Sequence, residues 1–381
     1  MDFPANFSRA GRVRMLSLVI TLIVVTVIAM SGAAAAQASA ARPMFKAIPP
    51  HNLYPGAVPP AGSLPQWTFK WTSSFNHRNF TSVFVGTDPS ITNSTTTVSV
   101  AVIPIKMVYG ASNGNMTFDP NAPYFRTAST IQIVMQSPIF KSSVDYVQGG
   151  TDLGKTQYID AYQRGNFWTD VESNTNYHVL LKAVTATSLT QTFNVPANEG
   201  SVISNPWSGI PTGTADIDWF DSQLQTVMTK LKIPANVLPL FITDNVYLTE
   251  FGGLCCIGGY HSANAPQPNG QTYSYATVIS QASIPVFSQD IGALSHEIGE
   301  WLLDPFVDNA SPCPSNGILE NGDPLETDTN PEFGDYPYTI GAFTYHPQDL
   351  VFLTWFGGPA TSVNNWVTFQ GQKLNVCQTG S

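Results

Sequence analysis

A histidine and two glutamates are spaced so that they can do chemistry together. The segment Ser295–Pro305 reads SHEIGEWLLDP. Positions i and i+4 share one face of a helix, so His296 and Glu300 can both reach one metal ion. Glu297 lies beside them, where it can take a proton from water, as in the zinc-binding H-E-x-x-H helix with glutamate in place of the second histidine. The alternative is a solvated helix edge with an ordinary hydrogen-bonded histidine, which the apolar residues 301–303 disfavour.

Asp304 is a further acidic residue at the end of this helix. It lies eight residues beyond His296, which is roughly 12 Å along the axis of a continuous helix. Zinc bonds of about 2 Å cannot join residues that far apart. With Pro305 next in the chain, we expect Asp304 to anchor the helix end and to support the ligands from outside.

The third ligand is expected from the acidic segment 320–323, which reads ENGD. Its glutamate follows Glu300 by twenty residues. This spacing resembles that of the gluzincin peptidases, where a glutamate at a comparable distance beyond the helix completes the zinc site. The resemblance implies a zincin-like fold, a glutamate base on the helix and ligands from both segments. Carried over to this chain, the base is Glu297, the ligands are His296, Glu300 and Glu320, and Asp323 supports them.

The metal expected at this site is zinc. The chain departs from the peptidase pattern because a second glutamate replaces a histidine. Two negative ligands leave zinc less able to acidify water than two neutral imidazoles do. Another divalent metal is therefore the alternative.

The same residues resemble a second family. An H-E-x-x-E helix, an acidic residue before proline and a following E-x-G-D segment are similar to the secreted phosphate-induced, EXORDIUM-like proteins. The matching residues are His296, Glu297, Glu300, Asp304, Pro305, Glu320, Gly322 and Asp323. This similarity implies an exported protein linked to growth of the cell wall. It does not imply any particular chemical reaction.

Two further histidines are weaker candidates. His346, in the segment 345–347, is expected to stabilise an oxyanion or to serve as a ligand. His261 follows two glycines and a tyrosine. It can line the cleft from the edge of a strand, but a packed core histidine explains it equally well. No serine, cysteine or lysine nucleophile motif of recognisable form is found, and G-x-S-x-G is missing.

All four cysteines fall in the last third of the chain: Cys255, Cys256, Cys313 and Cys377. An even number outside the cytoplasm indicates disulfides. Adjacent cysteines rarely pair with each other, so we predict that Cys313 and Cys377 each bond to one member of the adjacent pair. A thiolate metal site is the alternative, but its spacing fits no familiar ligand pattern.

Hydrophobic periodicity outlines the elements that must position these residues. Strand patterns occupy 67–109, 177–184, 237–248 and 273–279. Helices are expected at 127–140, 157–171, 216–231 and 290–303, the last being the motif helix. This order predicts an α+β fold with a mixed or antiparallel sheet, a β-rich N-terminal half and a zincin-like active-site helix.

The N-terminal region predicts export. Three arginines at positions 9, 12 and 14 precede an apolar run at 15–30, and Ala38-Ser39-Ala40 fits signal peptidase. The run is short for a membrane span of roughly 20 residues, so an uncleaved anchor is the weaker alternative. We expect a signal peptide at 1–40, an extended Pro- and Ala-rich leader at 41–66, a β-rich part at 67–200 and a zincin-like part with the metal motif at 201–381. The last two parts form either two domains or one at 67–381.

The amino-acid composition excludes some classes of binding partner. Loss of residues 1–40, with three arginines and one aspartate, takes the net charge from -10 to -12. An acidic chain with 16 Lys and Arg has no basic stripe for nucleic acid, and no membrane contact is expected after signal cleavage. We predict a secreted zinc-dependent, metallopeptidase-like hydrolase acting on extracellular protein or peptide. The alternative is a non-catalytic cell-wall or surface protein with a structural metal site.

Overall fold

The structure is a computed structural model. It describes residues 45–50, 62–125, 128–185, 187–205, 209–250, 254–268, 270–279, 290–313, 317–326, 336–371 and 374–377. The expected signal segment 1–40 and its cleavage site lie outside these residues, as does most of the expected leader. Residues Pro43–Ser381 form one compact unit. Within the described residues, no helix combines the length and apolarity needed to span a membrane.

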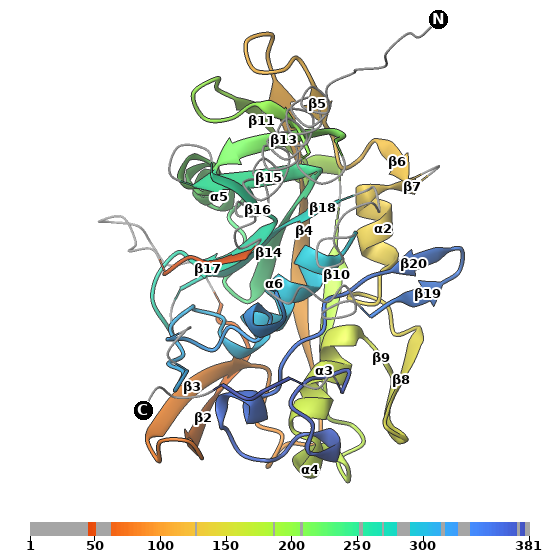
Figure 1. Cartoon of the computed structure of the whole chain (residues 1–381), viewed down its shortest axis with the longest axis vertical. Helices are drawn as coiled ribbons and strands as arrows, with labels where there is room; N and C mark the ends of the chain where they lie inside the picture. The colour runs from red at the N-terminus through yellow and green to blue at the C-terminus, as the bar shows by residue number, and fades with distance from the viewer. Residues whose placement is uncertain are drawn as a thin grey trace, which may run out of the picture. The chain divides into compact units, whose positions relative to one another are not determined.

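A mixed sheet of eight described strands lies at the centre of this unit (Figure 1). Its order is β1-β17-β18-β14-β4-β10, and β11 and β5 also pair with β4. Strands β17 and β18 are antiparallel, whereas β14 is parallel to both β18 and β4. The strands are β1 (Phe45–Ala47), β4 (Thr95–Tyr109), β5 (Thr117–Phe118), β10 (His178–Val184), β11 (Gln191–Val195), β14 (Val237–Asp244), β17 (Gly259–Ala263) and β18 (Thr272–Val278).

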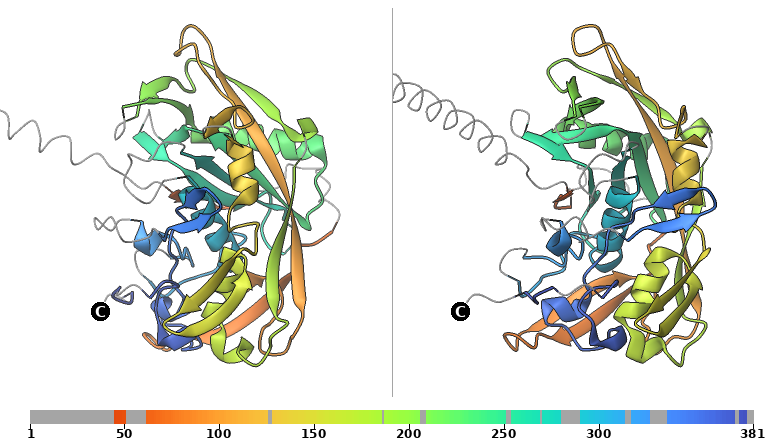
Figure 2. Two further views of the ribbon diagram at one scale, coloured as in Figure 1. Left: turned by 90° about the vertical axis from the view of Figure 1, so that its right-hand side faces the viewer. Right: turned by 45° about the vertical axis from the view of Figure 1, so that its right-hand side comes forward.

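Strands from both halves of the chain meet in this sheet. The long β4 lies beside β10 on one side and β14 on the other (Figure 2). The mixed sheet and the α+β class expected from the sequence are confirmed.

Smaller sheets and hairpins surround the main sheet. One has four strands, β12 (Val202–Ser204), β13 (Pro211–Asp216), β15 (Val246–Glu250) and β16 (Leu254–Ile257). The antiparallel pairs are β2 (Gln66–Thr72) with β3 (Asn79–Val85), β6 (Pro123–Phe125) with β7 (Ala128–Ser129), β8 (Val144–Gln148) with β9 (Thr151–Thr156), and β19 (Tyr338–Ile340) with β20 (Phe343–Tyr345).

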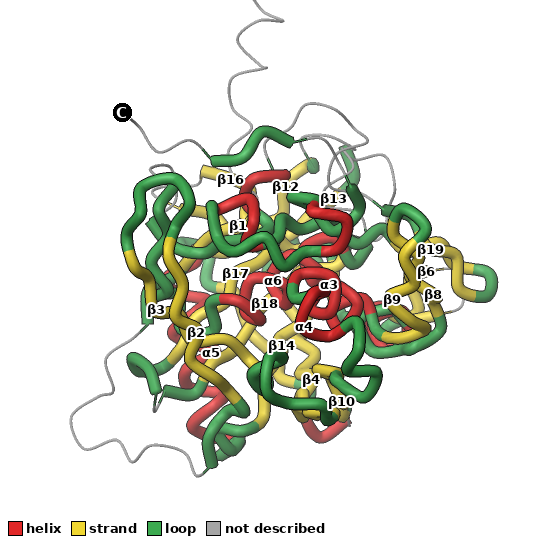
Figure 3. The backbone as a smooth tube through the Cα atoms, turned by 90° about the horizontal axis from the view of Figure 1, so that it is seen from below, coloured by secondary structure: helices red, strands yellow, loops and turns green. Residues whose placement is uncertain are grey.

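Helices cover the two faces of the main sheet. They are α2 (Thr130–Gln136), α3 (Tyr158–Asn166), α4 (Trp168–Val171), α5 (Ile217–Leu231) and α6 (Gly292–Leu303), with short 3₁₀ turns η1 (Thr187–Leu189), η3 (Asp323–Leu325), η4 (Leu353–Phe356) and η5 (Val363–Asn365). Alternate residues of β14 separate the faces, because Leu240 and Ile242 join the apolar cluster of α6 while Phe241 joins that of α5. Figure 3 shows α6 and α3 among the strands.

The predicted elements recur with shifted or shorter bounds, and the helix expected at 157–171 is divided into α3 and α4. The helix expected at 216–231 is α5, and the side chain of Asp216 caps it by accepting from two backbone N–H groups of its first turn. The strand expected at 237–248 is divided into β14 and β15. The break falls at Asn245, whose φ of 50° lies in the left-handed region that asparagine tolerates.

The predicted cysteine pairing is wrong. Cys313 bonds to Cys377, and Cys255 bonds to its neighbour Cys256. The backbone N–H of Cys377 donates to the carbonyl of Trp355, which holds Cys377 within reach of Cys313 in the loop after α6. The Cα atoms of Cys313 and Cys377 are 5.7 Å apart, within the ordinary range for a disulfide.

Candidate metal centre

The motif helix α6 is buried along its whole length. All twelve of its residues are buried, as expected for a helix that is apolar on every side except for its motif residues. It packs on the face of β17 and β18, with β3 and α3 beside it. The indole N–H of Trp301 donates to the hydroxyl of Thr272 on β18 at 2.9 Å and ties the helix to the sheet.

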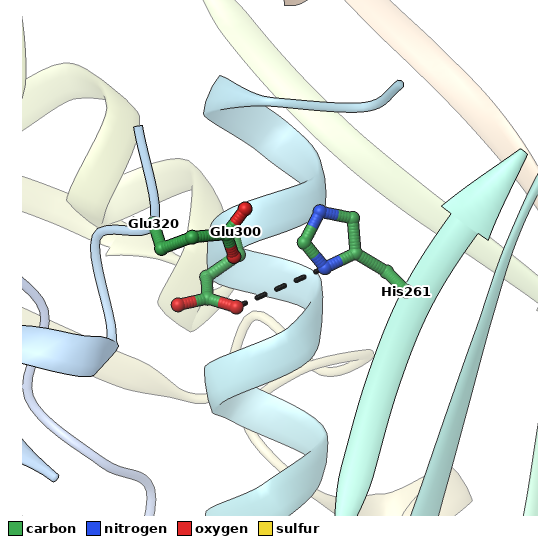
Figure 4. Close-up of side chains that lie close together, drawn as sticks. All are labelled: His261, Glu300 and Glu320. Atoms are coloured by element: carbon green, nitrogen blue, oxygen red, sulfur yellow. Dashed lines mark ion pairs between the residues drawn. The ribbon is translucent and has the colours of Figure 1, made fainter. Parts of the chain in front are cut away.

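Five side chains around α6 offer metal-binding atoms. These donors are His261, His296, Glu297, Glu300 and Glu320, and each is at most 2% exposed. They form two groups of three whose donor atoms all lie within 4.8 Å of one another. One group contains His261, Glu300 and Glu320, and the other contains His296, Glu297 and Glu300. Figure 4 shows the first group, with residues drawn from strand, helix and loop.

The proton of His296 can be located from its partners. Gln348 donates its Nε2 to the carbonyl of Gly322 at 2.8 Å, so its Oε1 faces the histidine. That oxygen lies 2.8 Å from Nδ1 of His296 and can only accept. The imidazole therefore carries its proton on Nδ1. Its Nε2 is bare and lies 3.0 Å from Oε1 of Glu300.

The same reasoning applies to His261, which projects from β17. Its Nε2 lies 3.0 Å from the backbone carbonyl of Asp304, which can only accept a hydrogen bond. The proton is therefore on Nε2 and leaves Nδ1 bare. This Nδ1 lies 3.2 Å from Oε2 of Glu297 and 3.8 Å from Oε2 of Glu300.

Two bare imidazole nitrogens thus face the same carboxylate in the buried interior. A lone pair and a carboxylate oxygen repel each other unless a proton or a cation lies between them. Among the described residues, Nε2 of His296, Oε1 of Glu297 and Oε1 of Glu320 have no hydrogen-bond partner. A histidine that donates one N–H to a carbonyl and turns its other nitrogen inward is the usual arrangement of a metal ligand. These residues could therefore hold a metal ion.

Burial sets the protonation states of the centre. It lowers the pKa of His261 to about 3 and also lowers the pKa of His296, so both rings are neutral. Burial likewise raises the pKa of Glu297, Glu300 and Glu320 well above the usual range, and the neighbouring carboxylates raise it further. Metal-free, the cluster holds protons; a divalent ion would displace them and keep the carboxylates charged.

Two glycines let the donors approach. A Cβ on Gly322 would lie 2.4 Å from Nδ1 of His296, and one on Gly259 would lie 2.6 Å from Cγ of Glu297. Gly322 belongs to the predicted acidic segment, whose backbone turns toward α6. The backbone N–H groups of Gly322 and Asp323 donate to Oε1 of Glu300 at 3.1 and 3.3 Å. Glycine is thus required at both positions for contact, not for a left-handed backbone.

The remaining predicted residues lie around the donors. Asp304 ends α6, and its Oδ1 accepts from the backbone N–H groups of Asp308 and Asn309 at 2.9 Å each. Asp323 places Oδ1 3.7 Å from Nε2 of His296. His346 pairs with Asp290 at 2.6 Å, just before the first turn of α6. It belongs to neither group of donors.

The N-terminal strand closes one side of the centre. The ring of Phe45 stacks on the ring of His296, with centroids 3.7 Å apart and planes inclined by 22°. Phe45 is itself 3% exposed, and its backbone N–H donates to Oε1 of Glu326 at 3.2 Å. Strand β1 runs parallel to β17, with Phe45 opposite Gly259 and Ala47 opposite His261.

From the sequence alone His261 is only a weak candidate, and Gln348 and Phe45 are not predicted to belong to a site. His261 and Gly259 are two apart on a strand and therefore point to the same face. The alternation of side chains along residues 258–261 is visible in the sequence, but only the three-dimensional structure shows that this face of β17 packs against α6. No sequence pattern marks Gln348 or Phe45.

A scan against protein-family models, a search of curated proteins and a search of solved structures each found no match to this chain. The chemistry of the centre therefore rests on its own residues: two neutral imidazoles and three carboxylates, buried together and facing one another.

Proposed function

We propose that this chain is a metal-dependent hydrolase of the metallopeptidase type, acting on extracellular protein or peptide. The observation that supports it best is the pair of bare imidazole nitrogens turned toward Glu300 (His296 at 3.0 Å and His261 at 3.8 Å). Such a pair with a carboxylate is the donor chemistry that zinc prefers. Zinc is the ion proposed, and another divalent metal is the alternative.

The donors are drawn from His261, His296, Glu300 and Glu320. Gln348 and the carbonyl of Asp304 orient the two imidazoles, and the backbone of Gly322 and Asp323 orients Glu300. When bound, the ion supplies a Lewis acid that polarises a carbonyl and lowers the pKa of water. This set adds His261 to the ligands that the gluzincin resemblance implied.

Glu297 is the proposed general base. Its Oε2 lies 3.2 Å from His261, while Oε1 is buried without a hydrogen-bond partner among the described residues. That free oxygen is placed to accept a proton from water. Burial raises the pKa of Glu297 above its ordinary value, which strengthens the carboxylate as a proton acceptor once a bound cation keeps it ionised. His346 stays with Asp290 and is proposed only as a positioning residue at the start of α6.

The proposed location is outside the cytoplasm. The basic, apolar and small-residue pattern of residues 1–40 supports export. The disulfides Cys313–Cys377 and Cys255–Cys256 fit an oxidising compartment. The acidic composition disfavours binding to the negatively charged backbone of nucleic acid. Proteins or peptides outside the cell are the proposed substrates.

A second candidate function has one observation in its favour. Every donor side chain is at most 2% exposed, and structural zinc sites are closed whereas catalytic sites keep an open position. A non-catalytic cell-wall or surface protein with a structural metal, as the resemblance to the phosphate-induced proteins implies, would have such a centre.

Turnover and stability separate the two. The secreted protein would be freed of metal with a chelator, reloaded with zinc and incubated with a peptide library and unfolded casein. The hydrolase predicts cleavage that chelation abolishes and zinc restores. Zinc that raises the melting temperature without cleavage of any substrate, once the centre has been opened as described below, would favour the structural protein.

A further inference from the structure

We propose that strand β1 is a built-in cover of the metal centre, so that the folded chain is latent until residues near Phe45 are displaced or removed. This inference rests on the proposed function, because it concerns access to the same donors. It also accounts for the burial that otherwise favours a structural metal.

The first support is the position of the ring of Phe45. It stacks on the face of the His296 imidazole, at 3.7 Å between centroids. In a parallel pair, residues opposite each other point to the same face of the sheet. Phe45 is opposite Gly259 and Ala47 is opposite His261, so both side chains lie on the sheet face that carries His261, and the ring of Phe45 covers His296.

The second support is that β1 is a removable element. It has three residues, forms the end of the sheet and pairs only with β17 among the described strands. If β1 left, β17 would keep its pairing with β18, and the pairing of the remaining described strands would be unchanged. Edge strands that are short and near a terminus open at a lower free energy than central strands.

The third support is that the strand is held by side-chain anchors. Lys46 forms an ion pair with Glu250 at the end of β15, and the hydroxyl of Ser262 donates to the carbonyl of Pro49 at 3.4 Å. Phe45 donates its backbone N–H to Glu326 in the turn that follows η3. The cover therefore joins β17, which carries His261, to Glu326, six residues beyond Glu320 in the chain.

Departure of β1 would expose one ring face of His296 and the edge of β17 next to His261. A peptide could then approach Glu300 and Glu297 from the side that Phe45 occupies. Cleavage of the chain after residue 50, or competition by another extended segment, would have the same result.

Histidine acylation tests the cover without relying on metal or turnover. Metal-free protein would be treated with diethyl pyrocarbonate, and each histidine followed by peptide mass spectrometry. The exposed His77 and the partly exposed His178 are internal standards. In the parent, His296 and His261 should react far more slowly than these two.

Three variants then separate the cover from general loss of packing. Phe45→Ala removes the ring, and Glu250→Gln loosens the anchor of Lys46 while leaving the apolar contact in place. Phe118→Ala is the matched control, since Phe118 is also buried but packs with Tyr109 in the other apolar cluster. Circular dichroism would confirm that each variant is folded.

We expect Phe45→Ala to raise the acylation rate of His296 by at least about tenfold, because the reaction follows the population of the open form. Glu250→Gln should give a smaller rise, and Phe118→Ala none at His296. A folded Phe45→Ala variant whose His296 reacts as slowly as in the parent overturns the cover, whatever the activity. So does rapid acylation of His296 in the parent.

Measurements of peptidase activity distinguish refutation of the cover from refutation of the proposed function. Zinc-loaded Phe45→Ala should cleave peptides faster than the parent. A rise in His296 acylation with no cleavage by any variant would leave the cover standing and refute the hydrolase. Equal cleavage by parent and variant, with unchanged acylation, would leave the hydrolase standing and refute the cover.

Discussion

Two buried carboxylates next to histidines differ in what surrounds them. Asp160 accepts from the backbone N–H of Val179 at 2.6 Å, from the hydroxyl of Thr156 at 2.6 Å and from Nδ1 of His178 at 2.7 Å. Every close partner of Asp160 is a donor, and the histidine is partly exposed to water. Glu300 has two backbone donors but also faces bare nitrogens of two buried histidines.

The difference shows how a structural carboxylate can be distinguished from a metal-binding one. A carboxylate whose neighbours all donate is satisfied by the protein itself. One whose neighbours include lone pairs and other carboxylates needs a cation or protons from outside. The Asp160 pair is satisfied by its protein donors, whereas the Glu300 cluster is satisfied only when protons or a cation lie between its lone pairs.

Replacing each carboxylate by its amide should give the largest contrast. Glu300→Gln removes the donor common to both groups, so we expect zinc binding measured by calorimetry to be lost. Asp160→Asn loses hydrogen bonds that are worth about 1–3 kcal/mol of stability, but its zinc affinity should equal that of the parent. Loss of zinc binding in both variants, or in neither, would remove the distinction between the two sites.

Glu297→Gln tests the role of the neighbouring glutamate. The amide keeps the shape of the side chain but cannot accept a proton, so turnover should fall by roughly the 10²–10⁴ of a general base. Zinc content should be unchanged, because His261, Glu300 and Glu320 remain. The measurement is kcat on a cleaved peptide, with Glu297→Gln made in the Phe45→Ala protein as its parent, beside elemental analysis. A variant as active as its parent would contradict the assigned role.

The pH dependence of stability should identify a third kind of buried carboxylate. Asp349 is fully buried, its Oδ1 accepts from two backbone N–H groups, and Oδ2 has no hydrogen-bond partner among the described residues. Burial raises the pKa of Asp349 from its ordinary value to about 7. No histidine is among its hydrogen-bond partners, so we expect it to hold a proton rather than a metal.

The sign follows from proton binding. Between about pH 4 and about pH 7 the folded state binds the proton of Asp349 more tightly than the unfolded state, so stability falls as pH rises, by at most about 1.4 kcal/mol per unit. Asp349→Asn keeps the accepting oxygen and removes the titration. Its unfolding free energy by denaturant should change less over this window than that of the parent. Parallel curves would show that Asp349 does not titrate in this range.

A pair of glycines gives the smallest effect and tests the packing of the centre. Alanine at Gly322 would place Cβ 2.4 Å from the His296 ring, whereas a Cβ at Gly317 has nothing within 4 Å. Displacement of the ring should lower zinc affinity about 10–100-fold, as loss of a ligand's support does. Gly317→Ala should bind zinc like the parent. Equal affinities for the two variants would mean that the ring of His296 does not need its present position.

The features of the metal centre that can be predicted from the sequence are those between residues close together in the chain. The spacing of His296 and Glu300 places them on one helix face, and there Nε2 of His296 lies 3.0 Å from Oε1 of Glu300. The helix bounds and the amphipathic α5 were likewise readable, because period and capping residues are local features.

The rest depends on contacts that are distant in sequence. His261 reaches α6 only because β17 pairs with β18 in one register, and a one-residue slip would turn it to the other face. The partners of the histidines, Gln348 and the carbonyl of Asp304, come from separate loops. The Cys313–Cys377 bond likewise joins residues that are distant in sequence, and the hydrogen bond that holds Cys377 beside Trp355 has no sequence marker.

Metal content tests the central claim most directly. The protein, secreted and equilibrated with zinc and then freed of loosely bound ions by gel filtration, would be analysed for metals together with the double variant His261→Ala/His296→Ala. The account predicts close to one divalent ion per chain in the parent, held by imidazole and carboxylate as in other zinc sites, and none in the double variant. A parent that retains no metal, or a double variant that retains as much as the parent, would contradict it.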